Sequence, residues 1–190
     1  MNITVELSPQ QMKKCHELAE KRHQSARSTG AICTLELKAK EDPILQDYIG
    51  LIGEVAYCIA YGLDTNKVFE DKRETLEELQ QGDVYHNGVF IDLKSSTWPN
   101  AKLIYPVQKK HRCKADYLCL VTVDLEASTA TIRGFAKAED FMRDENVGSL
   151  RGSRPLYIME QRDLEECPAF ITSKTKPKKF KHNLFDYYAF

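Results

Sequence analysis

The chain lacks the features that would place it in a membrane or outside the cell. Its 190 residues contain no apolar run that approaches the length needed to span a bilayer. The opening residues, 1–7, show no basic stretch followed by an apolar one, so we expect no signal peptide. We therefore expect a cytoplasmic protein that does not interact with membranes.

The cysteines and histidines form no pattern that is typical of a metal site. Among the 6 cysteines and 5 histidines, no Cys-x-x-Cys pair and no Cys/His zinc spacing occurs. We interpret all the cysteines as reduced thiols, most of them packed in the interior. With 42% hydrophobic and 29% charged residues, the composition is that of an ordinary globular protein with one sizeable core.

An excess of charge of one sign is also missing, because the formal net charge is −1. The basic residues nevertheless cluster in three segments, and such clusters can contact phosphates, although each one alone is more typical of a solvated surface. They lie on a first amphipathic helix expected over about 8–27, in residues 109–114, and in residues 174–181.

What the chain does have is a clear hairpin pattern over residues 82–94. Asn87-Gly88 strongly favours a two-residue type I′ turn, in which both residues take positive φ. That turn sets a register with Asp83 opposite Asp92. The other expected pairs are His86 with Val89, Tyr85 with Phe90, and Val84 with Ile91. Side chains alternate along a strand, so one face carries Asp83, Tyr85, Phe90, Asp92 and Lys94, and the other carries the core residues Val84, Val89, Ile91 and Leu93.

The two aspartates on the acidic face of this hairpin repel one another unless a positive charge lies between them. Like charges directly opposite one another destabilise a sheet, and a divalent cation such as Mg2+, which prefers carboxylate oxygens, would offset the repulsion between Asp83 and Asp92. Lys94 on the same face could orient or activate a water molecule. The alternative is an exposed hairpin face whose aspartates and lysine are simply solvated.

A buried helix upstream offers a third carboxylate. Residues 48–63 are apolar nearly all round, which is typical of a buried helix, and Glu54 is the only charged residue among them. Asp42 can cap this helix, Pro43 suits its first turn, and Gly62 is a plausible stop. A lone buried carboxylate is costly unless it is paired, protonated or bound to a metal. The alternative for Glu54 is a structural ion pair with Lys94 or with an arginine elsewhere.

Together these residues resemble the PD-(D/E)xK nuclease superfamily, which has the restriction-endonuclease-like fold. The matching positions are Glu54 on the helix, Asp83 at the start of the hairpin, and the triplet Asp92-Leu93-Lys94. Two departures are Gly82, where the family has its nominal proline, and Asp92, where glutamate is more common. The resemblance covers roughly residues 42–141.

The resemblance implies that Glu54, Asp83, Asp92 and the backbone carbonyl of Leu93 hold Mg2+, with Mn2+ able to substitute. It implies that Glu54, Asp83, Asp92 and Lys94 are catalytic, with Lys94 helping to activate the attacking water. It also implies an α/β fold with a mixed central sheet of about five strands flanked by helices. The residues that we expect to contact nucleic acid are Ser95, Ser96, Gln108, Lys109, Lys110 and Arg112.

We expect a single domain over residues 1–190, divided into an N-terminal helix and lead-in (1–41), a motif-bearing core (42–141) and a C-terminal extension with a basic tail (142–190). Beyond the hairpin, the pattern predicts a third strand over 103–107, a buried strand over 116–124 with an antiparallel partner over 129–136, a brief helix over 137–143 and a short strand over 156–158. Residues 31–41 and 64–81 are ambiguous, and 151–155 read as a loop.

The function that we expect is Mg2+-dependent hydrolysis of DNA phosphodiester bonds, by a monomer or a homodimer. One alternative is a non-catalytic nucleic-acid-binding module on the same fold. Another is a metal-dependent hydrolase that acts on a small phosphoester.

Overall fold

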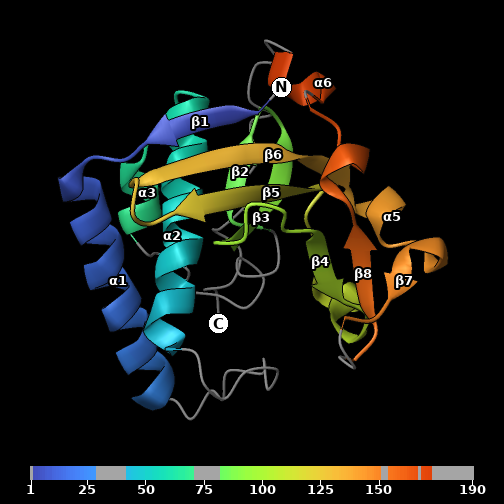
Figure 1. Cartoon of the computed structure of the whole chain (residues 1–190), viewed down its shortest axis with the longest axis horizontal. Helices are drawn as coiled ribbons and strands as arrows, with labels where there is room; N and C mark the ends of the chain where they lie inside the picture. The colour runs from blue at the N-terminus through green and yellow to red at the C-terminus, as the bar shows by residue number, and fades with distance from the viewer. Residues whose placement is uncertain (1, 29–41, 71–81, 151–153, 167, 173–190) are drawn as a thin grey trace, which may run out of the picture.

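The computed structural model describes residues 2–28, 42–70, 82–150, 154–166 and 168–172 (Figure 1). Its helices are α1 (Pro9–Ser28), α2 (Pro43–Ala60), α3 (Asn66–Phe69), α5 (Ala138–Phe141) and α6 (Ala169–Thr172). Its strands are β1 (Ile3–Glu6), β2 (Val84–His86), β3 (Val89–Ser96), β4 (Leu103–Pro106), β5 (Tyr117–Asp124), β6 (Thr129–Lys137), β7 (Val147–Gly148) and β8 (Leu156–Met159). Short 3-10 turns are η1 (Val107–Arg112), η2 (Asp144–Asn146) and η3 (Gln161–Asp163).

The expected α/β class and the central mixed sheet of five strands are confirmed. The strand order is β1-β6-β5-β3-β2, in which β3 and β5 are parallel and the other neighbours are antiparallel. A second sheet of three antiparallel strands has the order β4-β8-β7. No helix in the described ranges is both long enough and apolar enough to cross a membrane.

Two strands differ from the sequence-based expectation. Residues 103–106 do form a strand, β4, but it pairs with β8 in the second sheet rather than joining the central one. Its place among the central strands is taken by β1, which the sequence pattern did not indicate. β1 has only four residues, and it is a strand because β6 supplies its backbone partners from Thr129 to Ile132.

Local signals explain the two elements that carry the expected motif. The Asp42 carboxylate accepts a hydrogen bond from the Ile44 N–H at 2.9 Å and so caps α2, as predicted. After the helix, Gly62 has a φ of 66°, a left-handed conformation that glycine adopts at no steric cost. The hairpin turn has the expected positive φ at both Asn87 (48°) and Gly88 (96°).

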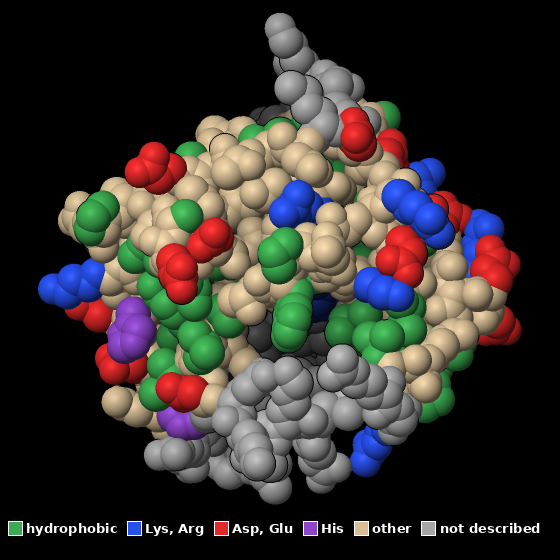
Figure 2. Space-filling model, in the orientation of Figure 1, with side chains coloured by type: hydrophobic (Ala, Val, Ile, Leu, Met, Phe, Trp, Pro, Cys, Tyr) green, Lys and Arg blue, Asp and Glu red, His purple; other side chains and the backbone are tan. Residues whose placement is uncertain are grey.

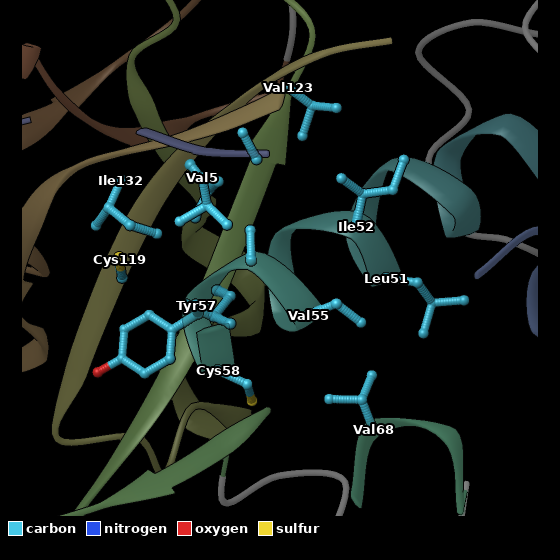
Figure 3. Close-up of a cluster of buried hydrophobic side chains, with 14 of the residues drawn as sticks. Val5, Leu51, Ile52, Val55, Tyr57, Cys58, Val68, Cys119, Val123 and Ile132 are labelled. Atoms are coloured by element: carbon cyan, nitrogen blue, oxygen red, sulfur yellow. The ribbon is translucent and has the colours of Figure 1, made fainter. Parts of the chain in front are cut away.

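The larger hydrophobic core lies between α2 and one face of the central sheet. Buried side chains of α2, including Leu51, Ile52, Val55 and Tyr57, pack with strand residues such as Val5, Val123 and Ile132 (Figure 3). Ile91 and Leu93 of β3 belong to the same core, so the predicted apolar face of the hairpin is confirmed. This packing turns the other side chains of β3 towards the opposite face of the sheet.

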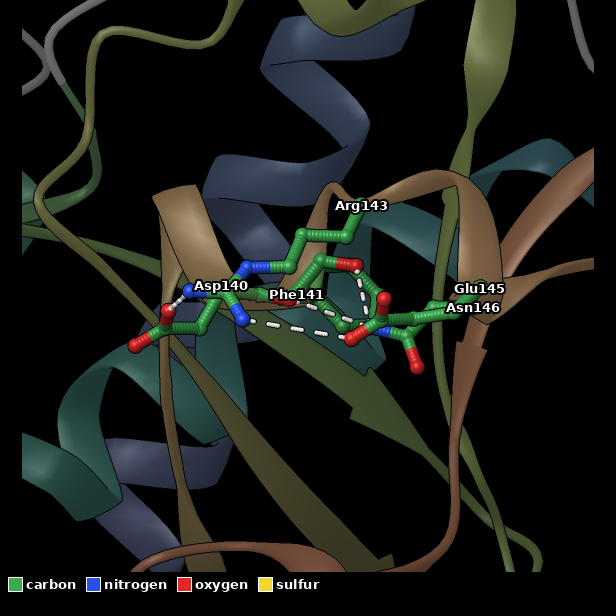
Figure 4. A network of polar contacts seen from close by, with 5 residues as sticks. All are labelled: Asp140, Phe141, Arg143, Glu145 and Asn146. Atoms are coloured by element: carbon green, nitrogen blue, oxygen red, sulfur yellow. Dashed lines mark hydrogen bonds and ion pairs between the residues drawn. The ribbon is translucent and has the colours of Figure 1, made fainter.

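On that opposite face, the second sheet covers Leu118 and Leu120 of β5 and forms a smaller core with them. After β6, the chain returns to the second sheet through a turn that polar contacts hold in place. Arg143 hydrogen-bonds to the Asp140 carboxylate, and the Asn146 amide donates to the carbonyls of Asp140 and Phe141 at 3.0 and 2.9 Å (Figure 4). The predicted brief helix in this region is confirmed as α5.

Several expectations fall outside the described residues. They concern 31–41 in the lead-in, 71–81 in the charged segment before the hairpin, 151–153 in the expected loop, and the basic tail from residue 173 onward.

Candidate active site

The hairpin register is confirmed at its three closest pairs. Val84 lies opposite Ile91, Tyr85 opposite Phe90, and His86 opposite Val89. The rings of Tyr85 and Phe90 are 4.9 Å apart between centroids, so these side chains share one face of the hairpin as predicted.

The regular ladder ends at Val84, one pair before the expected Asp83–Asp92 pair. The Asp83 N–H donates instead to the carbonyl of Ile91 at 2.8 Å, and its carboxylate Oδ2 accepts from the Leu93 N–H at 2.7 Å. Gly82 before it has a φ of 129°, and a Cβ there would lie 2.9 Å from the Ile91 carbonyl oxygen. A glycine is therefore required at this position, and the Asp83 carboxylate is fixed to the backbone of β3.

Asp92 and Lys94 form the ionic centre of the acidic face. Lys94 Nζ lies 2.5 Å from Asp92 Oδ1, and the two side chains are 33% and 15% exposed. Burial raises the pKa of Asp92, Lys94 lowers it, and the charge of Asp83 and a hydrogen bond to it raise it again, giving a pKa of about 6. The carboxylate of Asp83 therefore lies close enough for its charge to act on both Asp92 and Lys94.

Lys94 is held from two sides. Its ammonium group lies 5.4 Å from the centre of the Tyr105 ring, which the second sheet supplies. Burial lowers the pKa of Lys94, but the charges of Asp92 and Asp83 outweigh burial and leave the pKa above its ordinary value. Lys94 is therefore a charged group in this site. Tyr105 was not among the candidates, and no local signal could have found it, because it reaches Lys94 from a separate sheet.

Glu54 is buried, as expected, but its ionic partner lies elsewhere. Arg22 Nη1 of α1 lies 3.8 Å from Glu54 Oε1, so the alternative considered for Glu54, an ion pair with an arginine, is present. The Glu54 charge also adds to the effect of burial in raising the pKa values of the Cys15 and Cys58 thiols. Among the described residues, the structure groups Glu54 with α1, and Asp83 with Asp92 and Lys94. The metal-ligand role of Glu54 stays a prediction.

The helix of Glu54 nevertheless touches β3 beside the site. A Cβ on Gly53 would lie only 2.0 Å from the Ser95 hydroxyl oxygen, so α2 and β3 are in direct contact at these residues. That hydroxyl is buried and has no hydrogen-bond partner in the described structure. Ser95 therefore faces α2, whereas Ser96 faces the other way and accepts a hydrogen bond from the Trp98 N–H at 3.2 Å. The predicted nucleic-acid contact of Ser96 is on the face of Lys94, and that of Ser95 is not.

The other predicted nucleic-acid contacts lie on η1, after β4. Gln108 and Arg112 are exposed, and Lys109 is half-buried. The Lys110 ammonium donates to the carbonyl of Met142 at 2.7 Å and lies 5.5 Å from the centre of the Tyr157 ring. Lys110 thus anchors η1 to the second sheet.

The residues of the acidic face fit a hard divalent cation in part. The described residues contain no group of three or more His, Cys, Asp and Glu side chains that could hold a metal ion. They do contain the neighbouring carboxylates of Asp83 and Asp92, and a cation would offset the charge of Asp83 that raises the pKa of Asp92. Mg2+ is commonly held by one or two carboxylates, with water and substrate phosphate completing its coordination.

Comparison of the chain with known families, curated proteins and solved structures found no match. The arrangement of these side chains is therefore what points to a function.

Proposed function

We propose that the chain is a Mg2+-dependent deoxyribonuclease of the PD-(D/E)xK type, built on a restriction-endonuclease-like core. The observation that carries the proposal is the convergence of Asp83, Asp92 and Lys94 on one side of β3, with the pKa of Asp92 raised to about 6. A carboxylate whose pKa is raised by burial and by a neighbouring carboxylate is typical of catalytic and metal sites.

The proposed metal ligands in this site are Asp83, Asp92 and the Leu93 carbonyl, with Glu54 as a further ligand implied by the family resemblance. When bound, Mg2+ would polarise a phosphoryl oxygen and lower the pKa of a water molecule. The Asp83 carboxylate is well placed to act as a fixed ligand, because its hydrogen bond to the Leu93 N–H holds one oxygen against β3.

Lys94 supplies the positive charge of the site. It is half-buried and charged, and it is positioned by Asp92 and by the ring of Tyr105. Such an ammonium can hold an attacking water by hydrogen bonding and can stabilise negative charge that develops on the phosphoryl oxygens. Because the ammonium is already fixed, little reorganisation is needed when that charge appears.

The second candidate is the non-catalytic nucleic-acid-binding module. The ion pair between Glu54 and Arg22 favours it, since a glutamate with a structural partner is explained without a metal. The adjacency of Asp83 and Asp92 favours the nuclease, because a binding module for phosphates gains nothing from two carboxylates beside its lysine.

DNA cleavage with Mg2+ and with EDTA, by the wild type and by Lys94→Ala, tests the proposal. We expect cleavage by the wild type only with the metal, and a loss of about 10²–10³-fold or more in Lys94→Ala. Lys102→Ala is the matched control. Lys102 also pairs with a carboxylate, that of Glu160 at 2.6 Å, but this pair does not include Asp83, Asp92 or Glu54. Equal cleavage by both lysine variants, or no cleavage of any DNA form, would overturn the proposal.

A further inference from the structure

An arginine on β6 is set apart by an irregularity in the sheet. The pairing of β5 with β6 shifts between Leu120 and Val121, which pair with Gly134 and Ile132. Arg133 is therefore the extra residue of a β-bulge. Bulges are frequent beside functional sites, where they redirect one side chain.

Gly134 makes this bulge possible. Its φ is 149°, and a Cβ there would lie 2.7 Å from the Cβ of Leu164. An isolated glycine inside a strand pattern is a signal for a bulge, so the sequence did contain a pointer to this position. The bulge is thus built into the packing of β6 against the segment that follows β8.

The Arg133 side chain is held by a buried acceptor. Its Nε donates to the hydroxyl of Thr122 on β5 at 2.7 Å, and Thr122 is only 6% exposed. Arg133 itself is half-buried, and the structure gives it no carboxylate partner among the described residues, unlike Arg22, Arg143 and Arg162. The hydrogen bond to Thr122 leaves the two terminal amino groups of the guanidinium available to an anion.

This guanidinium lies on the same face of the sheet as Lys94. β3 pairs in parallel with β5, which sets Lys94 beside Leu120 and Ser96 beside Thr122. The neighbouring side chain of Val121 is in the core against α2, so Thr122 and Arg133 face away from that helix. Two strand spacings separate Lys94 from Arg133, about 10 Å.

Figures 1 and 2 show the side of the molecule on which this face of β5 and β6 lies. In Figure 1, β5 and β6 cross in front of α2, so the face of these strands that is turned away from the helix points towards the viewer. Figure 2 shows that side of the molecule, where Lys and Arg side chains lie near a hollow at its centre.

We infer that Arg133 binds a backbone phosphate of a nucleic-acid strand whose neighbouring phosphate lies at Asp92 and Lys94. The fork of a guanidinium matches two phosphate oxygens, and an arginine that is already oriented by Thr122 loses little side-chain entropy when it binds. The inference rests on the proposed function for the identity of the second phosphate. The binding by Arg133 itself requires no cleavage.

The test is the binding of fluorescein-labelled DNA, single-stranded and duplex, measured by anisotropy in EDTA over a range of salt concentrations. We expect Arg133→Gln to weaken binding about tenfold or more and to reduce the slope of log affinity against log salt by about 1. Arg133→Lys should keep the salt slope but not the affinity, because it keeps the charge and loses the fork. Arg162→Gln is the matched control, since Arg162 is an 84% exposed arginine.

Thr122→Val tests the positioning directly, because valine has the shape of threonine and removes only the acceptor for Arg133. We expect weaker binding at an unchanged salt slope. Thermal unfolding of each variant identifies any loss of fold, and binding is compared below the lowest melting temperature.

The outcomes for the inference and for the proposed function are distinct. Binding that depends on Arg133 but is followed by no cleavage with Mg2+ supports the inference and overturns the nuclease. Cleavage by a wild type whose affinity and salt slope equal those of Arg133→Gln overturns the inference alone. A wild type that binds no DNA in EDTA also overturns the inference.

Discussion

Two ionic clusters lie close to the contact between α2 and β3, one centred on α2 and one on β3, and they differ in how their charges balance. On the side of α2, one carboxylate, Glu54, meets one guanidinium, Arg22, at 3.8 Å. On β3 and just before β2, two carboxylates, those of Asp92 and Asp83, both act on the ammonium of Lys94. The first cluster pairs one carboxylate with one guanidinium, whereas the second brings two carboxylates to the ammonium of Lys94.

This difference in charge indicates which cluster is organised to bind a ligand. A buried ion pair with matched charges is explained by folding alone, provided that its geometry compensates for desolvation. A buried pair of carboxylates is a cost to the folded protein unless a proton or a cation joins it. Burial and the charge of Asp83 both raise the pKa of Asp92, so we expect added cations to act at Asp92 and Asp83.

The largest expected effect concerns the metal. Asp92→Asn should reduce Mg2+-dependent DNA cleavage about 10³-fold and remove any rise in melting temperature on adding Mg2+, because the amide is a poor ligand and carries no charge. Activity assays and thermal unfolding with and without Mg2+ check this. An unchanged Mg2+-dependent melting shift would place the metal elsewhere.

The other cluster provides the comparison for that result. Glu54→Gln and Arg22→Gln should each lower the free energy of unfolding, by about 3 kcal/mol, because each leaves a largely buried charge without this partner. If Glu54 also binds Mg2+, as the family resemblance implies, only Glu54→Gln should lose the Mg2+-dependent melting shift. We expect this difference between the two variants. Equal Mg2+-dependent melting shifts in Glu54→Gln and Arg22→Gln would show that Glu54 acts only in the ion pair.

Measuring stability over a range of pH tests the interaction between the carboxylates of Asp83 and Asp92. The pKa of Asp92 is raised from 3.8 to about 6, so the folded state holds its proton more tightly than the unfolded chain does. This carboxyl group therefore makes stability fall as pH rises from about 4 to about 6. Asp83→Asn should lower the pKa of Asp92 and flatten that fall in EDTA, while its amide oxygen still accepts from the Leu93 N–H.

Asp116→Asn is the matched control for this series. The Asp116 carboxylate also accepts a hydrogen bond from a backbone N–H of β3, that of Phe90 at 2.7 Å, but Asp116 is exposed and has no part in the pKa of Asp92. Urea unfolding at several pH values should show that stability depends on pH in Asp116→Asn as it does in the wild type. If stability also falls with pH as steeply in Asp83→Asn as in the wild type, the carboxylates of Asp83 and Asp92 do not interact.

The smallest effect concerns the contact between α2 and β3. Gly53→Ala should lower the free energy of unfolding by about 1–2 kcal/mol, because its Cβ would press on the Ser95 side chain. The double variant Gly53→Ala, Ser95→Ala should recover most of that loss. Gly50→Ala, on the same helix with open space around it, should be neutral or stabilising. Similar losses at both glycines would argue against a close helix–strand contact.

The parts of the fold that the sequence predicted are those with local causes. The Asn87–Gly88 turn determines the register of the hairpin, and the cap at Asp42 determines where α2 begins. β1 and the second sheet were missed or misplaced because their partners are distant in the chain. β4, for example, becomes part of a sheet only through β8.

The candidate site divides in the same way. Asp83, Asp92 and Lys94 could be brought together from the alternation of side chains within one hairpin. The partner of Glu54 could not be chosen from the sequence, because Arg22 reaches it from a separate helix. Arg133 and Thr122 meet through a register shift between two strands, and only Gly134 signals that shift locally.

The short outer strand β2 has one further consequence, for how the protein avoids association with itself. β2 is the last strand of the central sheet, and an outer strand offers unpaired backbone groups to which another chain could add. β2 has only three residues, and just before it Asp83 turns its own N–H to Ile91. Asp83 thus also removes one backbone donor from the edge that β2 would offer to another chain.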